Sequence, residues 1–162
     1  MRIKTIKLIS LFGTLLLALS AVSVQAETPK RGGTLVMTIG TTPRHLNPAV
    51  QSGIATGEPG AQLFATLVRF DDKWNAQPYL AKSWQTSADG LAVTFNLVEG
   101  ATFHDGKPIT SKDVAFSIKT IKANHPFKTM FRAVSSVETP NPNKVIFKLS
   151  QPHPALMLAL SS

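Results

Sequence analysis

Apolar and polar residues alternate most clearly over residues 91–97. On an extended chain one face would be entirely apolar (Val93, Phe95, Leu97), and the other would carry Thr94 and Asn96. The preceding dipeptide Asp89-Gly90 is a preferred pair for a two-residue hairpin turn. The pattern therefore predicts a half-buried antiparallel hairpin between residues 83–86 and 91–97.

A second hairpin is predicted closer to the C-terminus. Residues 134–138 precede a turn-rich stretch at 140–143, and residues 145–149 again alternate, with Val145, Phe147 and Leu149 on one face. Beyond it, residues 154–160 are apolar and resemble the opening of a helix, so we expect the sequence to be cut within an element.

One helix is predicted between the two hairpins. Thr110 is a candidate N-cap with Asp113 completing a capping box, and Asn124-His125-Pro126 ends the helix. Its apolar face is spaced at helical intervals (Val114, Ile118, Ile121). Phe127 and Phe131 follow the break, where they either line a cleft and contact a ligand or pack in the core. Other aromatic side chains are expected in the core (Trp84, Phe95, Phe103, Phe116, Phe147).

The first part of the mature chain has weaker signals. Residues 34–39 (TLVMTI) are rich in β-formers and predict a buried strand, which residues 40–44 interrupt. Glu58-Pro59 is a favourable helix start, and Leu63, Phe64, Leu67 and Val68 would form the helix's apolar face. Residues 71–75 predict a polar turn. The whole order is α/β (mixed α and β), with antiparallel hairpins.

Residues 1–26 have the layout of a cleaved secretory signal peptide. Three basic residues precede an apolar run of roughly twelve residues, too short to span a membrane, and Val24-Gln25-Ala26 supplies small residues for the peptidase. We therefore expect export to the periplasm and a mature domain over 27–162. The chain has no cysteine, so we expect neither disulfides nor a lipid anchor.

Charge and residue spacing argue against other classes of function. The basic residues are scattered without aromatic interleaving, which disfavours nucleic-acid binding. The four histidines (His45, His104, His125, His153) show no metal-ligand spacing, and no nucleophile elbow is present. His104-Asp105 is more simply a turn than an acid–base pair. We expect no catalytic residues, no metal and no cofactor.

Several segments together resemble the extracellular solute-binding proteins of family 5, the peptide and nickel receptors of ATP-driven importers. They are residues 78–84 (PYLAKSW), 88–91 (ADGL), 94–97 (TFNL) and 100–114 (GATFHDGKPITSKDV), supported by 32–35 (GGTL) and 46–48 (LNP). The resemblance implies a two-lobed type II periplasmic binding protein, of which 27–162 is an incomplete first lobe. It also implies a monomer that captures a small solute, most often a peptide, and delivers it to ABC permease subunits in the inner membrane.

The resemblance implies that Gly40, Thr41, Thr42, Pro43 and Arg44 border the ligand, where backbone groups pair with an extended peptide. The alternative is an ordinary exit from a strand, with Arg44 a surface residue. Family members are several times longer, so the chain is a fragment or the product of a truncated gene. Two other functions remain open: a transport-inactive exported remnant or interaction domain, and a hydrolase of unrecognised type. The ligand and the cognate permease are not determined.

Overall fold

The computed structural model describes residues 31–161. The chain divides into two units, residues 1–37 and 38–162, which are described separately. The signal peptide predicted over 1–26 lies outside the described residues. In the first unit, residues 31–37 are exposed and contain neither helix nor strand. The buried strand predicted over 34–39 is therefore wrong for this structure. A strand is made by ladder hydrogen bonds to a neighbour, and residues 34–39 have no such neighbour among residues 31–161.

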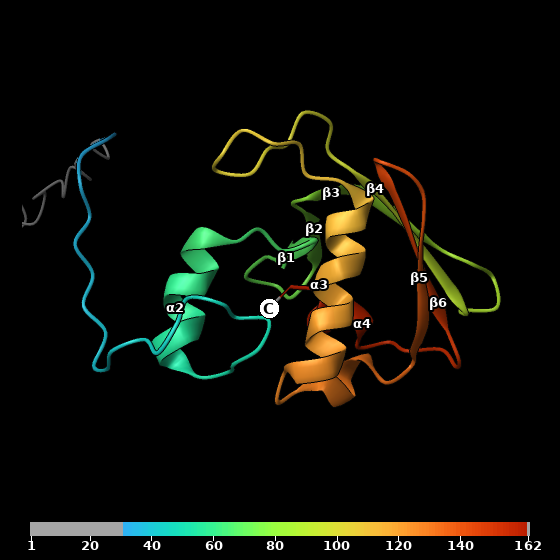
Figure 1. The fold of residues 1–162 in the computed structure, drawn as a ribbon. Coiled ribbons are helices and arrows are strands. Elements are labelled where there is room, and N and C mark those ends of the chain that lie inside the picture. The colour runs from blue at the N-terminus through green and yellow to red at the C-terminus, as the bar shows by residue number, and fades with distance from the viewer. Residues whose placement is uncertain (1–30, 162) are drawn as a thin grey trace, which may run out of the picture. The chain divides into compact units, whose positions relative to one another are not determined.

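The second unit is built on a four-stranded antiparallel sheet, seen nearly edge-on in Figure 1. Its strands are β3 (Ala81–Thr86), β4 (Ala92–Leu97), β5 (Val134–Asn141) and β6 (Lys144–Leu149), in the order β3-β4-β6-β5. Both predicted hairpins are confirmed, and β6 joins them by pairing with β4. The segment between the hairpins leaves the sheet and returns at its edge.

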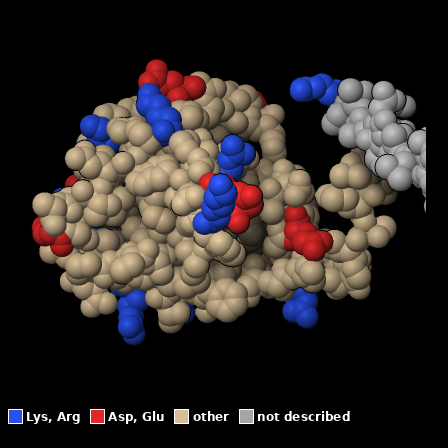
Figure 2. Space-filling model, turned by 180° about the vertical axis from the view of Figure 1, so that it is seen from behind, with Lys and Arg blue, Asp and Glu red and all other residues tan. Residues whose placement is uncertain are grey.

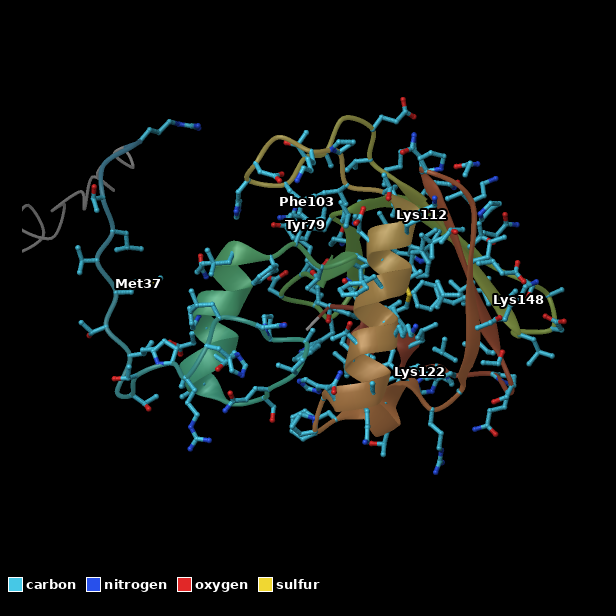
Figure 3. All side chains as sticks on the ribbon, in the orientation of Figure 1. Met37, Tyr79, Phe103, Lys112, Lys122 and Lys148 are labelled. Carbon is cyan, nitrogen blue, oxygen red and sulfur yellow. The ribbon has the colours of Figure 1, made fainter. Side chains whose placement is uncertain are left out.

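That segment contains α3 (Ser111–Asn124), which lies across one face of the sheet (Figure 1), and the short 3-10 helix η1 (Lys128–Phe131). The predicted capping box is present. The Asp113 carboxylate accepts hydrogen bonds from the Thr110 backbone N–H and hydroxyl, both at 2.7 Å. At the other end, Lys122 Nζ donates to the Val134 carbonyl at the start of β5. Figure 3 labels Lys112 and Lys122 at opposite ends of this helix.

The core fills the space between α3 and the sheet. The predicted faces are confirmed: Phe95 and Phe147 are fully buried, and their rings meet edge to face with centroids 5.4 Å apart. Further members come from β4 and β6, from α3 and from the C-terminal segment (Val93, Leu97, Val114, Ile118, Val145, Leu149, Leu156, Leu160), and others come from β1 (Val68–Phe70), β3, η1 and β5 (Val68, Ala81, Phe131, Val134). The predicted C-terminal helix is present as α4 (Leu156–Ala159).

Two aromatic side chains expected in the core are exposed instead. Phe116 is 70 % exposed because it lies on the side of α3 away from Val114 and Ile118. Phe103 is 44 % exposed in the turn that precedes α3. In that turn the Gly106 N–H donates to the Phe103 carbonyl at 2.9 Å, so backbone geometry rather than burial fixes the phenylalanine.

A second, two-stranded sheet precedes the main one. It pairs β1 (Val68–Phe70) with β2 (Ala76–Pro78), and the predicted turn at 71–75 joins them. The Asp71 carboxylate holds this turn by accepting from the backbone N–H groups of Lys73 and Asn75 at 3.0 and 2.8 Å. Trp74 sits at the turn with a positive φ of 60° and is exposed.

The helix predicted to start at Glu58-Pro59 begins earlier, as α2 (Ile54–Leu63). Gly53, with φ of 111°, turns the chain into the helix, and its carbonyl accepts from the N–H groups of Thr56 and Gly57 at 3.1 and 2.8 Å. Pro59 therefore lies inside the helix. Because α2 ends at Leu63, three residues predicted on its apolar face lie beyond it (Phe64, Leu67, Val68). Val68 lies instead in β1, where it pairs with Pro78 and is fully buried.

Candidate ligand-binding segment

The segment predicted to border a ligand, residues 40–44, lies near the start of the second unit. It forms neither helix nor strand, and Gly40, Thr41, Thr42 and Arg44 are exposed, whereas Pro43 is half-buried. No backbone hydrogen bond involves residues 40–44 within the described part of the chain. The C=O groups of residues 40–44, and the N–H groups of all of them except Pro43, are therefore available to an extended partner.

The residues that follow anchor this segment to α2. The Asn47 side-chain oxygen accepts from the Ala49 N–H at 3.0 Å, which makes a local turn. The Thr56 hydroxyl, in a buried residue of α2, donates to the His45 carbonyl at 3.3 Å. Pro48 packs closely on Gly60: a Cβ added to Gly60 would lie 3.0 Å from two ring carbons of Pro48. One end of the segment is therefore fixed by packing while its backbone stays open.

Arg44 is the cation of this segment. Its side chain is exposed, and it forms none of the ion pairs found among residues 31–161. Those pairs are all between solvent-exposed groups: Lys82–Glu99, Lys107–Asp105 and Lys148–Glu138. Its guanidinium is therefore not already occupied by one of the described carboxylates.

The structure separates the two phenylalanines that follow α3. Phe131 is 4 % exposed and belongs to the core, which is the alternative that the sequence left open. Phe127 is 56 % exposed, and its ring lies 5.6 Å from that of His125. Partial burial lowers the pKa of His125, whose Nδ1 accepts the Phe127 N–H at 3.1 Å. Of the pair, Phe127 alone offers an accessible ring, and ligand contact by either residue stays a prediction.

A shallow hollow that the sequence did not indicate lies where α3 begins. Its volume is about 350 Å³, and it is lined by the start of α3, the end of β5 and the turn after it (Thr110, Ser111, Lys112, Thr139, Pro140, Asn141, Pro142). The buried Ser111 hydroxyl donates to the Asn141 carbonyl, and its N–H donates to the Pro142 carbonyl, both at 2.7 Å. These bonds fasten the helix to the hairpin, so the hollow has a structural explanation. The helix cap at Thr110 and the turn at 140–143 could each be predicted from neighbouring residues. Their contact could not, because it joins residues 30 positions apart in the sequence.

The described residues contain no group of three metal-ligating side chains close enough to hold an ion. Over the same range, no helix has both the length and the apolar character to cross a membrane. His104-Asp105 lies in the predicted turn, where the Asp105 carboxylate pairs with Lys107 Nζ at 2.9 Å. That hydrogen bond lowers the pKa of Asp105. On the face drawn in Figure 2, basic and acidic groups are intermixed without a basic patch.

Known proteins match much of this chain. The family described as "Bacterial extracellular solute-binding proteins, family 5 Middle" matches residues 75–162. A putative ABC transporter peptide-binding protein of Brucella ovis is 39% identical over 102 residues, which is 60% of this chain and 19% of the relative. The periplasmic oligopeptide-binding protein OppA of Haemophilus influenzae is 32% identical over 113 residues, which is 66% of this chain and 21% of the relative.

Solved structures agree with these relatives. NikZ from Campylobacter jejuni, in complex with Ni(L-His), is 34% identical with a TM-score of 0.67, over 75% of this chain and 25% of NikZ. The substrate-binding protein CtaP from Listeria monocytogenes is 32% identical with a TM-score of 0.71, over 81% of this chain and 28% of CtaP. The chain thus spans about a fifth of the length of these curated relatives. Since the family match covers more than half of the chain, the chain belongs to the bacterial extracellular solute-binding proteins, family 5.

Proposed function

We propose that the protein is the periplasmic substrate-binding component of an ABC importer, which captures a peptide and delivers it to permease subunits in the inner membrane. Its action is binding and release rather than catalysis. Membership of the family supports the binding role. The names of the Brucella ovis and Haemophilus influenzae relatives favour a peptide as the solute.

The observation that carries the proposal is the open backbone of residues 40–44. An extended peptide needs backbone donors and acceptors for its own N–H and C=O groups, and a chain that is exposed, irregular and unpaired supplies them. The turn at Asn47 and the packing of Pro48 on Gly60 restrain one end of this segment. A restrained segment loses less conformational entropy when the peptide binds.

Arg44 gives the segment 40–44 its specificity for a negatively charged group. A guanidinium forms charge-assisted, often bidentate hydrogen bonds with a carboxylate, such as a peptide's C-terminus or an acidic side chain. The side chain of Arg44 is exposed and outside the ion pairs of residues 31–161. Transport then requires that the bound peptide favours a closed form of the complete two-lobed receptor. A ligand shifts the equilibrium between the open and closed forms only if it binds one of them more tightly than the other.

The first experiment uses the native gene product from the periplasmic fraction of the source organism, with its intact mass and N-terminus determined. Its thermal unfolding is followed with separate pools of short peptides, opines, sugars and nickel chelates. We expect the peptide pool alone to raise the melting temperature, since a ligand at about 100 times its Kd adds about 2.7 kcal/mol of stability. A response to a different pool would contradict the peptide assignment, and no response at all would contradict solute capture.

The second experiment tests the segment with matched arginine variants. Arg44→Ala is expected to weaken peptide binding roughly tenfold or more, because a hydrogen bond to a charged group contributes about 1.5–3 kcal/mol. Arg69→Ala removes another exposed arginine, in β1, and is expected to leave the affinity unchanged. Equal affinities for both variants, measured by calorimetry, would remove Arg44 from the binding segment.

A further inference from the structure

Helix α2 has a buried face that does not contribute to the hydrophobic core. Its buried residues are Thr56 and Gly60, which are four positions apart and therefore lie one turn from each other on the same side of the helix. Its larger apolar side chains, Ile54 and Leu63, are exposed, and within residues 31–161 no α2 residue belongs to the core cluster. Packing against the main sheet therefore does not explain why Thr56 and Gly60 are buried.

Both buried residues instead contact the chain that follows the candidate ligand-binding segment. The Thr56 hydroxyl donates to the carbonyl of His45 at 3.3 Å. Gly60 lies against Pro48, and a Cβ added to Gly60 would be 3.0 Å from two carbons of the proline ring, so a larger residue would push the proline away. Residues 45–48 are therefore held at both ends by one side of α2.

We propose that Thr56 and Gly60 are positioning residues for ligand binding, which place Arg44 and the open backbone before it without touching the ligand themselves. This role rests on the proposed peptide binding and adds α2 to the binding machinery. A fixed His45 carbonyl restrains the backbone one residue away from Arg44. The guanidinium then loses less conformational freedom when it pairs with a carboxylate, so the affinity for a peptide is higher than it would be with a free segment.

Substitutions at Thr56 separate the effect of its hydroxyl from that of its shape. Thr56→Val keeps the shape and removes the donor, whereas Thr56→Ser keeps the donor and removes a methyl group. Calorimetry measures the affinity of the complete exported gene product for trialanine with free termini. Thr56→Val is expected to bind about three- to tenfold more weakly, because a hydrogen bond is lost, and Thr56→Ser to bind within about twofold of the parent protein. Equal affinities for the two variants, or weaker binding by Thr56→Ser, would overturn the proposal.

Two glycines of α2 provide a second matched pair of variants. Gly57→Ala and Gly60→Ala both replace a helical glycine, but the new Cβ meets open space at position 57 and meets Pro48 at position 60. Gly60→Ala is expected to weaken trialanine binding about threefold or more, because the displaced proline misplaces the segment, and Gly57→Ala is expected to leave it unchanged. Equal trialanine affinities for the two variants would overturn the positioning role of this side of α2.

An Arg44→Ala background distinguishes failure of the positioning role from failure of the proposed function. Thr56 is expected to act through the segment that carries Arg44, so Thr56→Val and Arg44→Ala together should weaken binding by less than the product of the two single effects. Losses that multiply would overturn the positioning role. So would an Arg44→Ala variant that binds weakly beside a Thr56→Val variant that binds normally, and in both cases peptide capture would stand. A product that binds no trialanine would contradict peptide capture together with the positioning role.

Discussion

Truncation of Phe147 to alanine is the sharpest test of the fold. Phe147 lies in β6 opposite Val93 of β4, with none of its surface exposed. Its ring meets that of Phe95 edge to face at 5.4 Å. The α3 residues Val114 and Ile118 belong to the same buried cluster. The variant therefore removes a ring from the junction of the two hairpins and the helix.

The expected loss is large compared with the whole stability of a domain of this size. Removing a buried phenylalanine ring costs about 3–5 kcal/mol, because the transfer free energy is lost and a cavity remains. The edge-to-face contact with Phe95 adds about 0.5–1.5 kcal/mol to that burial. Since small domains unfold at a cost of about 5–15 kcal/mol, Phe147→Ala should bring the chain close to its unfolding transition.

Urea unfolding followed by tryptophan fluorescence measures the effect. Trp84 packs against the core, with its ring 6.4 Å from that of Phe95, and therefore reports on this region. A Trp74→Phe background removes the exposed second tryptophan. Phe116→Ala is the matched control, because an exposed ring should change the unfolding free energy by less than about 0.5 kcal/mol.

The refuting outcome is a Phe147→Ala variant no less stable than Phe116→Ala. Such a result would mean that the sheet and α3 do not form the stabilising core, and it would remove the physical basis for the strand order. A change in the dependence of the unfolding free energy on urea, rather than in its midpoint, would instead indicate a change in the surface exposed on unfolding.

Two further predictions concern α2 and the β1–β2 turn. In α2, the Cβ added by Gly57→Ala meets open space, so this variant should stabilise the helix by about 0.5–1 kcal/mol. Gly60→Ala should lose that gain, because its new Cβ would lie 3.0 Å from Pro48. Amide hydrogen exchange in α2 measures the difference, and equal protection in both variants would mean that the packing of Pro48 on Gly60 is unimportant. The hydrogen bond from the Asn75 backbone N–H lowers the pKa of Asp71 most, and hydrogen bonds from the Asn75 and Gln77 side chains and the Lys73 backbone lower it further. Because the folded pKa is depressed, the turn's stabilisation is present above the unfolded value of about 4 and lost as the pH falls through the folded pKa. Asp71→Asn should therefore flatten the acid dependence of Trp74 fluorescence, and an unchanged dependence would exclude Asp71 as its source.

Elements whose signals are local could be predicted from the sequence alone. The Asp89-Gly90 turn is closed by neighbours: Asp89 accepts from the Leu91 N–H at 2.9 Å and from the Ser87 hydroxyl. The α3 cap joins Thr110 to Asp113, three residues away. Alternation over 92–97 and 144–149 then selected the buried faces. These contacts are settled within a few residues, so no knowledge of the rest of the fold was needed.

Tertiary structure decided which apolar residues are buried and where the weaker elements begin. Phe116 and Phe131 both follow apolar patterns, yet the first is exposed on α3 and the second lies in the core. The start of α2 depended on the positive φ of Gly53, and Val68 lies in a strand that pairs with Pro78 and packs into the core rather than on a helix.

The candidate site also combines features that the sequence indicated with features that only tertiary contacts revealed. Residue types and the family resemblance indicated residues 40–44, but only the structure shows that their backbone is unpaired within residues 31–161 and that Pro48 rests on Gly60. Residues 34–39 have the composition of a strand and form no backbone hydrogen bond with residues 31–161. Composition sets the propensity of a segment, whereas strand formation and burial require a second surface that the segment does not encode.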